Sequence, residues 1–196
     1  PSRERGRPRE FDTDLALDNA MTVFREKGFH AASVSDLSQA MNLTAGSIYK
    51  AFTDKRTLFL KVFERYTSLR NAQLRQQIEG LTTGRERIAE VLRFYLKSSH
   101  EIEGRRGCLV VAGTVELLTF DNEVATLVRQ AITRNKAFLT SLIEQGQHDG
   151  SVSATLDPDA ASMLMLYIVL GMRVAGKVEN NPDGDPTLEL ALKILD

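Results

Sequence analysis

Small and hydroxyl-bearing side chains gather in one short run of the sequence, TAGS at residues 44–47. If this run opens a helix, its backbone can approach another surface closely, and its free N–H groups and hydroxyls can bond phosphate oxygens or base edges. Tyr49 and Lys50 follow and add a phenol and a cation. The chemistry that these residues favour is recognition of a nucleic acid.

Residues typical of catalysis or metal binding are scattered. His30, His100 and His148 show no HExxH or other ligand spacing. The sequence contains no phosphate loop, dinucleotide-binding glycine pattern or nucleophile elbow. Glu116 is a lone carboxylate in an apolar run, where a capping or paired structural role is more usual than a ligand contact. We therefore expect no catalytic residue, metal or cofactor, and an all-α enzyme is only a residual alternative.

Two short helices joined by a tight turn are predicted over residues 33–52. Ser33 is a good N-cap, and Asp36 lies near the positive end of the helix that follows. Asn42 tolerates the left-handed conformation that ends helices, and Thr44 caps a second helix over 45–52. The arrangement matches a helix-turn-helix whose second helix enters the major groove, although an ordinary helical hairpin gives the same pattern.

Charge confines any DNA contact to a few places. The chain has 196 residues and a net charge of −1, so it is not a basic coat for nucleic acid. Residues 1–9 carry four arginines against one glutamate. Within them, Arg5-Gly6-Arg7-Pro8 resembles a hook that places arginines in a narrow minor groove, and a solvated tail is the alternative.

Helical periodicity dominates the rest of the chain and predicts an all-α fold. Residues 101–107 are expected to form a polar loop, and 108–120 a helix, although its β-branched residues also suit a buried strand. The remaining helices are expected over 11–27, from 54 towards 78, and over 85–103, 122–148, 159–177 and 186–195.

The helix expected at 159–177 is apolar on nearly every face. A membrane span is one interpretation, but Ser162, Arg173 and the short length argue against it. A helix buried on two sides, by its own core and by a partner, fits better. The single cysteine and the lack of a signal-peptide pattern lead us to expect a cytoplasmic protein that is not bound to a membrane.

Residues 6–66 resemble the DNA-binding domain of TetR-family transcriptional regulators. The resemblance rests on GRPREF, VFREKGF, SVSDLSQAMNL and GSIYKAFTDKRTLF. It implies that the helix at 44–52 enters the major groove and that Lys55 meets a phosphate. Ala51 stands where many members carry His or Tyr, which removes a usual backbone contact, so affinity would depend more on Lys50 and the arm. Thr53 stands where many carry Pro or Gly, and Asn42 replaces the commoner Gly, which the left-handed position tolerates. The expected DNA-binding residues are Arg5, Arg7, Ser33, Thr44, Ala45, Gly46, Ser47, Tyr49, Lys50 and Lys55.

We therefore expect an N-terminal three-helix helix-turn-helix domain at 1–56. A long fourth helix joins it to an all-α ligand-binding and dimerisation domain at 57–196. The implied function is a homodimeric transcriptional regulator on a pseudo-palindromic operator in double-stranded DNA. It would be a repressor released by a small, largely apolar effector, and a constitutive or activating dimer without an effector is the alternative.

Candidates for the effector site come from the apolar residues of the second domain, although any one of them can equally be core. They are Phe94, Cys108, Val111, Val115, Leu118, Phe120, Leu127, Met163 and Tyr167. Cys108 follows two arginines, which lower a thiol pKa, and it resembles an electrophile-reactive cysteine of one family branch; a buried apolar role is the alternative. The expected dimer interface contains Met165, Ile168, Met172, Leu188 and Leu192.

Overall fold

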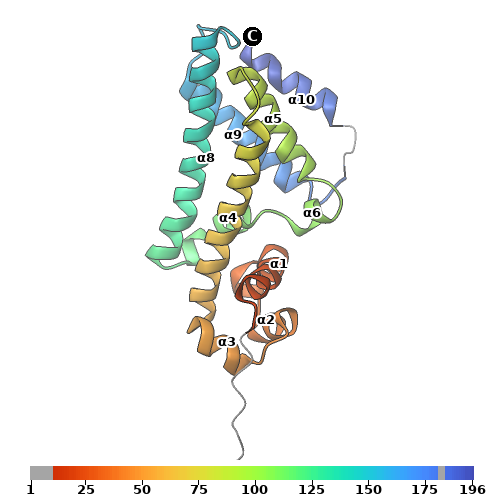
Figure 1. Cartoon of the computed structure of the whole chain (residues 1–196), viewed down its shortest axis with the longest axis vertical. Helices are drawn as coiled ribbons and strands as arrows, with labels where there is room; N and C mark the ends of the chain where they lie inside the picture. Colours follow the sequence, from red (N-terminus) through yellow and green to blue (C-terminus); the bar gives the residue numbers. More distant parts are fainter. Residues whose placement is uncertain (1–10, 181–183) are drawn as a thin grey trace, which may run out of the picture.

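The structure, a computed structural model, describes residues 11–180 and 184–196, and every regular element in these ranges is helical. The first three helices form one end of the molecule, and α4 runs from them into the other end (Figure 1). The first four are α1 Thr13–Ala31, α2 Val34–Met41, α3 Ala45–Phe52 and α4 Lys55–Ile78. The others are α5 Gly84–Lys97, α6 Glu101–Arg106, α7 Leu109–Val115, α8 Asn122–Asp149, α9 Pro158–Ala175 and α10 Asp185–Leu192, with short 3-10 turns η1 Leu117–Thr119 and η2 Lys193–Leu195.

Side-chain caps fix the boundaries of α2 and α3 as predicted. The Ser33 hydroxyl accepts from the Asp36 N–H while the Asp36 carboxylate accepts from the Ser33 N–H, which closes a capping box. Asn42 ends α2 in the left-handed conformation, with φ of 53°. Thr44 caps α3 by accepting from the Ser47 N–H. Because each helix end is satisfied locally, the turn between α2 and α3 is well determined.

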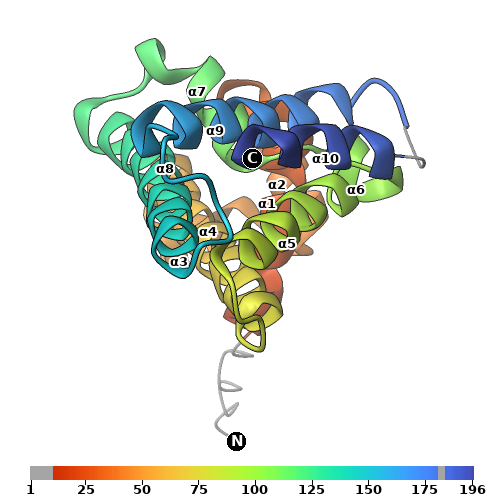
Figure 2. The same cartoon turned by 90° about the horizontal axis from the view of Figure 1, so that it is seen from above.

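Two hydrophobic cores meet along α4. The lower core joins α1, α2 and α3 to the first part of α4, from Leu58 to Tyr66, and also includes α7 and the start of α8. The upper core joins Leu74 and Ile78 of α4 to α5, α8, α9 and α10. Viewed from above, α9 and α10 lie on the side opposite to α4 (Figure 2). The single helix α4 therefore belongs to both cores and links them rigidly.

The structure corrects the predicted elements between residues 85 and 120. The helix expected to reach 103 ends at Lys97, where the Ser98 and Ser99 hydroxyls bond the carbonyls of Phe94 and Tyr95. The expected loop contains α6, whose Gly104 packs so closely that a Cβ would lie 2.4 Å from the Ser99 carbonyl oxygen. The helix expected over 108–120 ends at Val115 and continues as η1.

The helix α9 is long and apolar enough to cross a membrane by length and composition alone. In the structure, Met165, Leu166 and Val169 of α9 are buried in the upper core, and Arg173 near its end is buried as well. A second row of apolar α9 residues stays exposed. Some apolar residues of α9 thus pack into the chain's own core, and others form one exposed face.

Candidate nucleic-acid interface and effector cavity

The start of α3 presents the predicted small and hydroxyl-bearing residues on one exposed surface. Ile48 and Phe52 point inward and are buried, which turns the opposite side of α3 outward. The Thr44 hydroxyl donates to Ser47 Oγ at 2.9 Å and accepts from the Ser47 N–H at 3.1 Å, so the two side chains hold each other. The exposed residues of this surface are Thr44, Ala45, Gly46, Tyr49 and Lys50, with Ser47 half-buried beside them.

Gly46 keeps this surface flat. A Cβ added at Gly46 would meet nothing closer than Thr44 Oγ1 at 4.0 Å. A Cβ at Gly84 or Gly146 would instead come within 2.3 Å of another atom of the protein. Packing within the chain therefore explains those glycines but not Gly46. The missing side chain at Gly46 leaves room for something outside the protein to approach the α3 backbone.

The turn before α2 carries an ion pair that fixes its shape. Lys27 Nζ lies 2.8 Å from Asp36 Oδ1, and Ser33 is exposed beside them. The Lys27 ammonium, together with the Ser33 N–H and hydroxyl, lowers the pKa of Asp36 to about 2. Ser33 thus lies at an exposed helix N-terminus, where an anion is favoured.

The prediction that Lys55 meets a phosphate is not supported. Its ammonium donates to the carbonyls of Phe29 at 2.8 Å and Ala32 at 3.0 Å, and it lies 4.5 Å from the centroid of the Phe29 ring. These contacts hold the end of α1 against the start of α4. The sequence could not show these contacts of Lys55, because the two carbonyls come from a distant part of the chain. Arg5 and Arg7 lie outside the described residues.

Several polar contacts that sequence reasoning missed tie the lower helices to the rest of the molecule. The Glu116 carboxylate accepts from the N–H of Phe29 at 2.8 Å and of His30 at 3.0 Å, just after α1 breaks at Gly28. The structural role expected for Glu116 is therefore confirmed. Arg56 forms ion pairs with Asp121 and Glu123 at the start of α8. No local sequence signal marks such partners, because they lie far apart in the chain.

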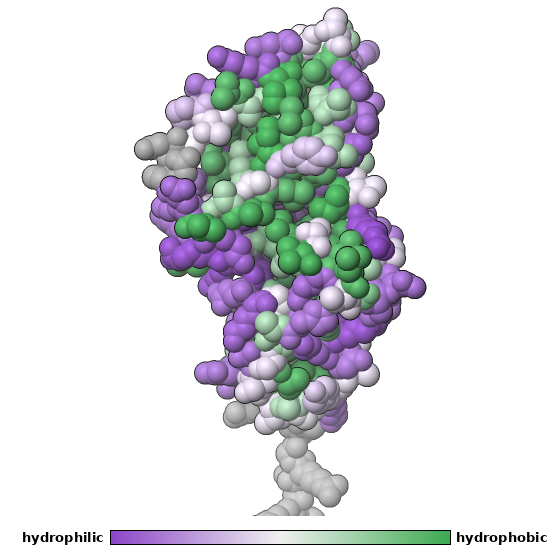
Figure 3. Space-filling view, turned by 180° about the vertical axis from the view of Figure 1, so that it is seen from behind, coloured by the Kyte–Doolittle hydropathy of each residue, from purple (hydrophilic) through white to green (hydrophobic). Residues whose placement is uncertain are grey.

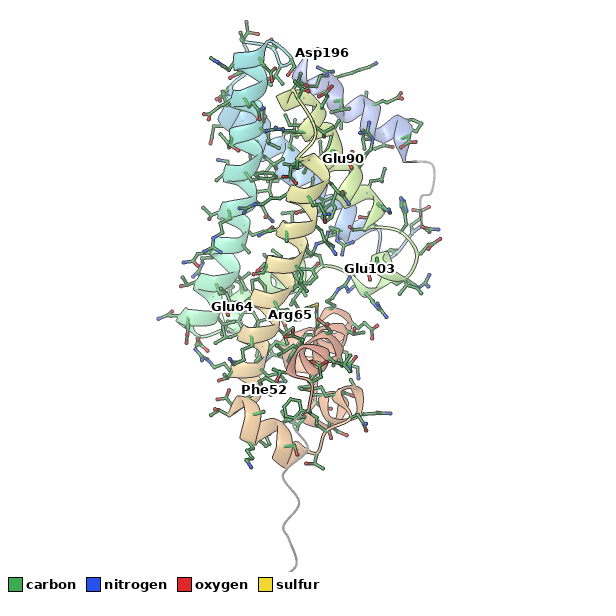
Figure 4. The ribbon with its side chains drawn as sticks, viewed as in Figure 1. Phe52, Glu64, Arg65, Glu90, Glu103 and Asp196 are labelled. Carbon is green, nitrogen blue, oxygen red and sulfur yellow. The ribbon has the colours of Figure 1, made fainter. Side chains whose placement is uncertain are left out.

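A second group of polar contacts lies around α6 and joins it to α1 and α9. Arg25 of α1 pairs with Glu103 at 2.8 Å and donates through Nε to the Gly107 carbonyl at 2.9 Å. The same carbonyl accepts from Arg173 Nη2 of α9 at 2.9 Å. Figure 4 shows Glu103 on α6, just above α1. One carbonyl thus connects α1 of the lower core to α9 of the upper core.

A cavity lies among α4, α5, α8 and α9. Its larger compartment has a volume of about 250 Å³ and is lined by residues such as Leu74, Val91 and Phe138. A smaller compartment of about 40 Å³ reaches Tyr66 and Cys108. The compartments are adjacent, because both are lined by Asn71, Tyr95, Arg134 and Asn135. We call the two together the effector cavity.

The structure brings only part of the predicted effector site to this cavity. Cys108 and Leu127 line the smaller compartment, and Phe94 lines a neighbouring open groove under the Arg70 guanidinium. Val115 and Leu118 are 82% and 96% exposed, so their assignment was wrong: α7 ends before it can turn them inward.

The remaining candidates for the effector site lie elsewhere. Phe120 packs edge-to-face on Phe29 in the lower core, and Tyr167 is 62% exposed on α9, so neither lines the cavity. Val111 and Met163 are half-buried against the lower and upper core.

Cys108 is buried at the inner end of the cavity, next to charged groups. Burial is the largest single influence on the pKa of its thiol and raises it, but the Arg173 and Arg70 guanidinium groups and neighbouring hydrogen-bond donors together outweigh burial, so the pKa falls below its usual value. Burial also raises the pKa of Tyr66 well above its usual value, so its hydroxyl keeps its proton. At the inner end of the cavity, the surroundings thus favour loss of a proton from the Cys108 thiol but not from the Tyr66 hydroxyl.

The predicted dimer residues divide between the core and the surface. Met165 and Leu188 are buried in the chain's own upper core, so they are unavailable to a partner, and their assignment was wrong. Ile168, Met172 and Leu192 are half-buried. One row of α9 residues is instead exposed at the spacing of a helix face: Leu164, Tyr167, Gly171 and Val174, which we call the α9 stripe. Apolar side chains gather on this face of the molecule, away from α4 (Figure 3).

Comparison with known proteins gives matches over both parts of the chain. The family model described as "Bacterial regulatory proteins, tetR family" matches residues 16–62. The model described as "Tetracyclin repressor-like, C-terminal domain" matches residues 84–187, more than half of the chain.

Individual relatives agree with these matches. A structure of a cysteine mutant of the TetR-family regulator CifR, complexed with a 26-bp double-strand operator DNA, is 30% identical with a TM-score of 0.82, covering 95% of this chain and 98% of that one. The transcriptional repressor ComR of Escherichia coli is 26% identical over 89% of this chain and 84% of its own. The transcriptional regulator YezE of Bacillus subtilis is 26% identical over 97% of this chain and its whole length.

Proposed function

This chain belongs to the TetR family of bacterial regulatory proteins and is a DNA-binding transcriptional regulator rather than an enzyme. From that premise we propose that it is a homodimeric repressor that leaves its operator when a small molecule fills the effector cavity. One observation carries the proposal. Asn71, Leu74 and Arg75 of α4 line the cavity, and α4 begins directly after α3. An occupant of the cavity therefore touches the helix that follows the DNA-contacting surface.

The α9 stripe supports the homodimer. Its residues recur every three or four positions along α9, which is the spacing of one helix face. A Cβ at Gly171 would meet nothing within 4 Å inside the chain, so this glycine leaves room for a close external approach. A twofold-symmetric dimer buries the same stripe from both subunits. It also presents two α3 helices to a pseudo-palindromic operator.

The relatives support repression. The relatives ComR and BdcR of Escherichia coli are described as repressors. For release, the effector must bind the DNA-free conformation more tightly than the DNA-bound one, and the linkage is reciprocal. A coupling of about 1–3 kcal/mol, or roughly 5–150-fold in operator affinity, is the usual range. The constitutive or activating dimer is the competing function.

The direct test is footprinting on the DNA that flanks the gene of this protein, with and without candidate metabolites. A protected pseudo-palindrome that is lost with one metabolite class supports a released repressor. Protection that no metabolite changes supports the constitutive alternative. A template that is transcribed more strongly when the protein binds supports an activator.

Two lysines provide a matched pair of variants for the DNA contact. Lys50→Ala should weaken operator binding by about 1–3 kcal/mol and relax specificity if Lys50 contacts a base, or weaken all sequences equally if it contacts a phosphate. Lys55→Ala should instead lower the melting temperature, because its ammonium holds two carbonyls inside the protein. Anisotropy titrations with operator and random DNA, beside thermal melts, separate these outcomes. Operator affinity unchanged by Lys50→Ala would contradict the assigned α3 surface.

A further inference from the structure

Buried hydrogen-bond donors without partners lie at the inner end of the effector cavity. Among the described residues, the Tyr66 hydroxyl and Nε and Nη1 of Arg173 make no hydrogen bond, although their side chains belong to residues only 3% and 1% exposed. Tyr66 lines the cavity, and Arg173 bonds the carbonyl of Gly107, the residue before the cavity-lining Cys108. Because an unmatched buried cation is unfavourable, this end of the cavity favours an anion.

The remaining charged groups around the cavity are also cations. Arg70, Arg75 and Arg134 line it, and neither compartment is lined by an Asp or a Glu. None of these arginines forms a salt bridge with any residue in 11–180 or 184–196, whereas Arg65 and Arg25 pair with Asp18 and Glu103. The lining of the cavity therefore contains cations and no carboxylate, which favours a positive potential there.

Arg70 is held in place by aromatic rings rather than by an anion. Its Cζ lies 4.6 Å from the centroid of Phe94 and 5.6 Å from that of Tyr66, and Nη2 donates to Ser98 Oγ at 3.1 Å. Such stacking orients a guanidinium and leaves part of its donor edge available. Arg70 is thus prepared to bind a carboxylate without first breaking an ion pair.

The Glu103 carboxylate is near enough to Arg173 to offset part of its charge, and the Cys108 thiolate is the cavity-lining group able to do the same. The thiolate would supply a single negative charge beside Arg173. It would still leave more guanidinium groups than anions around the cavity, because Arg70, Arg75 and Arg134 line it as well. A thiolate therefore accounts for part of the arrangement, and the excess of positive charge still favours an anionic ligand.

We propose that the effector carries an anionic group, most simply a carboxylate, that binds in the smaller compartment beside Tyr66, Arg70 and Arg134. Its apolar body extends along the larger compartment towards Leu74, Val91 and Phe138. This inference rests on the proposed function, because it gives the chemical class of the ligand of the same cavity. It also changes the expected effector from a largely apolar molecule to an amphipathic acid.

The test compares small acids with their uncharged amides on the full-length protein. The pairs are hexanoate with hexanamide, benzoate with benzamide, and phenylacetate with phenylacetamide, measured at neutral pH by calorimetry and thermal shift. We expect at least one acid to bind about tenfold or more tightly than its own amide. The same acid should weaken operator binding in a parallel anisotropy titration.

Variants on one helix provide the matched control. Arg134→Gln on α8 removes a cavity arginine and should reduce the preference for the acid severalfold. Arg129→Gln removes an exposed arginine of the same helix that does not line the cavity, and should leave the preference unchanged. Tyr66→Phe removes only the unpartnered hydroxyl and should weaken acid binding more than amide binding. These variants avoid Arg173, whose substitution risks unfolding the upper core.

The outcomes separate this inference from the proposed function. Amides that bind as tightly as their acids, or acids that do not bind at all, overturn the anionic effector. If an amide nevertheless releases the operator, the proposed function as a released repressor is retained, but without an anionic effector. If an acid binds with the expected preference but leaves operator affinity unchanged, the anion site stands and the proposed release is wrong. An equal effect of Arg134→Gln and Arg129→Gln would also overturn the inference.

Discussion

Two helical glycines of this protein have open space where a side chain would be. They are Gly46 on α3 and Gly171 on α9, while Gly84, Gly104 and Gly176 are each required by a backbone atom closer than 3 Å to a Cβ. A glycine within a helix costs about 0.5–1 kcal/mol relative to alanine. At Gly46 and Gly171, no internal contact offsets that cost. Both residues lie on the surfaces that we assign to external partners.

Gly46→Ala should therefore separate folding from function. We expect the melting temperature to stay unchanged or rise, because alanine favours the helix by about 0.5–1 kcal/mol and clashes with nothing in the chain. Operator affinity should fall, because the new methyl keeps the α3 backbone away from the DNA. Gly80→Ala is the control, since Gly80 also has open space but lies just beyond the other end of α4. Full operator affinity in a stable Gly46→Ala variant would refute this role.

Asp36 should make the helix-turn-helix sensitive to acid. Its folded pKa is about 2 because of Lys27 and the Ser33 donors, whereas an unfolded aspartate titrates at about 3.9. A depressed folded pKa contributes stability above the unfolded pKa, and this stability is lost as the pH falls from about 4 towards 2. Thermal melts of the wild type and Asp36→Asn should therefore differ at pH 6 and converge at low pH. A difference that does not change with pH would contradict the assignment.

At the scale of the elements, the corner of the fold formed by α7, η1 and the start of α8 contacts the end of α1 and the start of α4. Glu116 caps the segment after Gly28, and His30 Nε2 lies 2.7 Å from Thr119 Oγ1. Arg56, in the first turn of α4, pairs with Asp121. The end of α1 and the start of α4 are thus attached to the same corner. A shift of α7 or α8 must move both helices together.

Removing the Glu116 carboxylate should weaken that attachment. Glu116→Ala leaves the N–H groups of Phe29 and His30 without their acceptor, which should cost about 1–3 kcal/mol of unfolding free energy. Glu116→Gln keeps one acceptor oxygen and should cost less. Urea unfolding measures both. Glu64→Ala, at an exposed position of α4 (Figure 4), is the control and should have little effect. Equal stability of Glu116→Ala and wild type would show that the cap is not needed.

The capping residues in the sequence allowed several helices to be predicted, but not the contacts between helices. The caps Ser33, Thr44 and Asp54 lie next to the helices that they begin, so the sequence alone indicated α2, α3 and the start of α4. The short helix α6 has no apolar pattern of its own. It depends on the close packing of Gly104 on Ser99, which only the folded chain provides.

Periodicity also failed where a helix is apolar all round. In α9 it could not show that Met165 faces the core while Tyr167 faces outward, because both neighbours of each position are apolar as well. The cavity-lining arginines were missed for a different reason. Arg70 and Arg134 look like ordinary solvated charges in the sequence, and only the fold brings them together around one cavity.

At the scale of the whole molecule, the two exposed functional surfaces are well separated. The α3 surface lies at the lower end of the molecule, and the α9 stripe lies higher, on the face away from α4 (Figures 1 and 3). The effector cavity lies between the helices that join them. The proposed dimerisation through the α9 stripe would therefore leave α3 free. It would also fix the distance between two α3 helices, which operator binding requires to be about 34 Å or a multiple of it.

Substitutions along α9 test this assembly, because we expect different effects on the buried and the exposed face of this helix. Tyr167→Arg puts a charge on the exposed stripe, so we expect a folded monomer by light scattering at micromolar concentration. It should lose most affinity for the full operator while keeping weak binding to a half-site. Met165→Arg puts the charge in the upper core and should unfold the protein, since a buried unpaired charge typically costs about 3–5 kcal/mol. Leu190→Arg, at an exposed position of α10, is the control and should remain a dimer. If Tyr167→Arg stays a dimer with full operator affinity, the interface lies elsewhere, and the spacing of the α3 helices must be set by another surface.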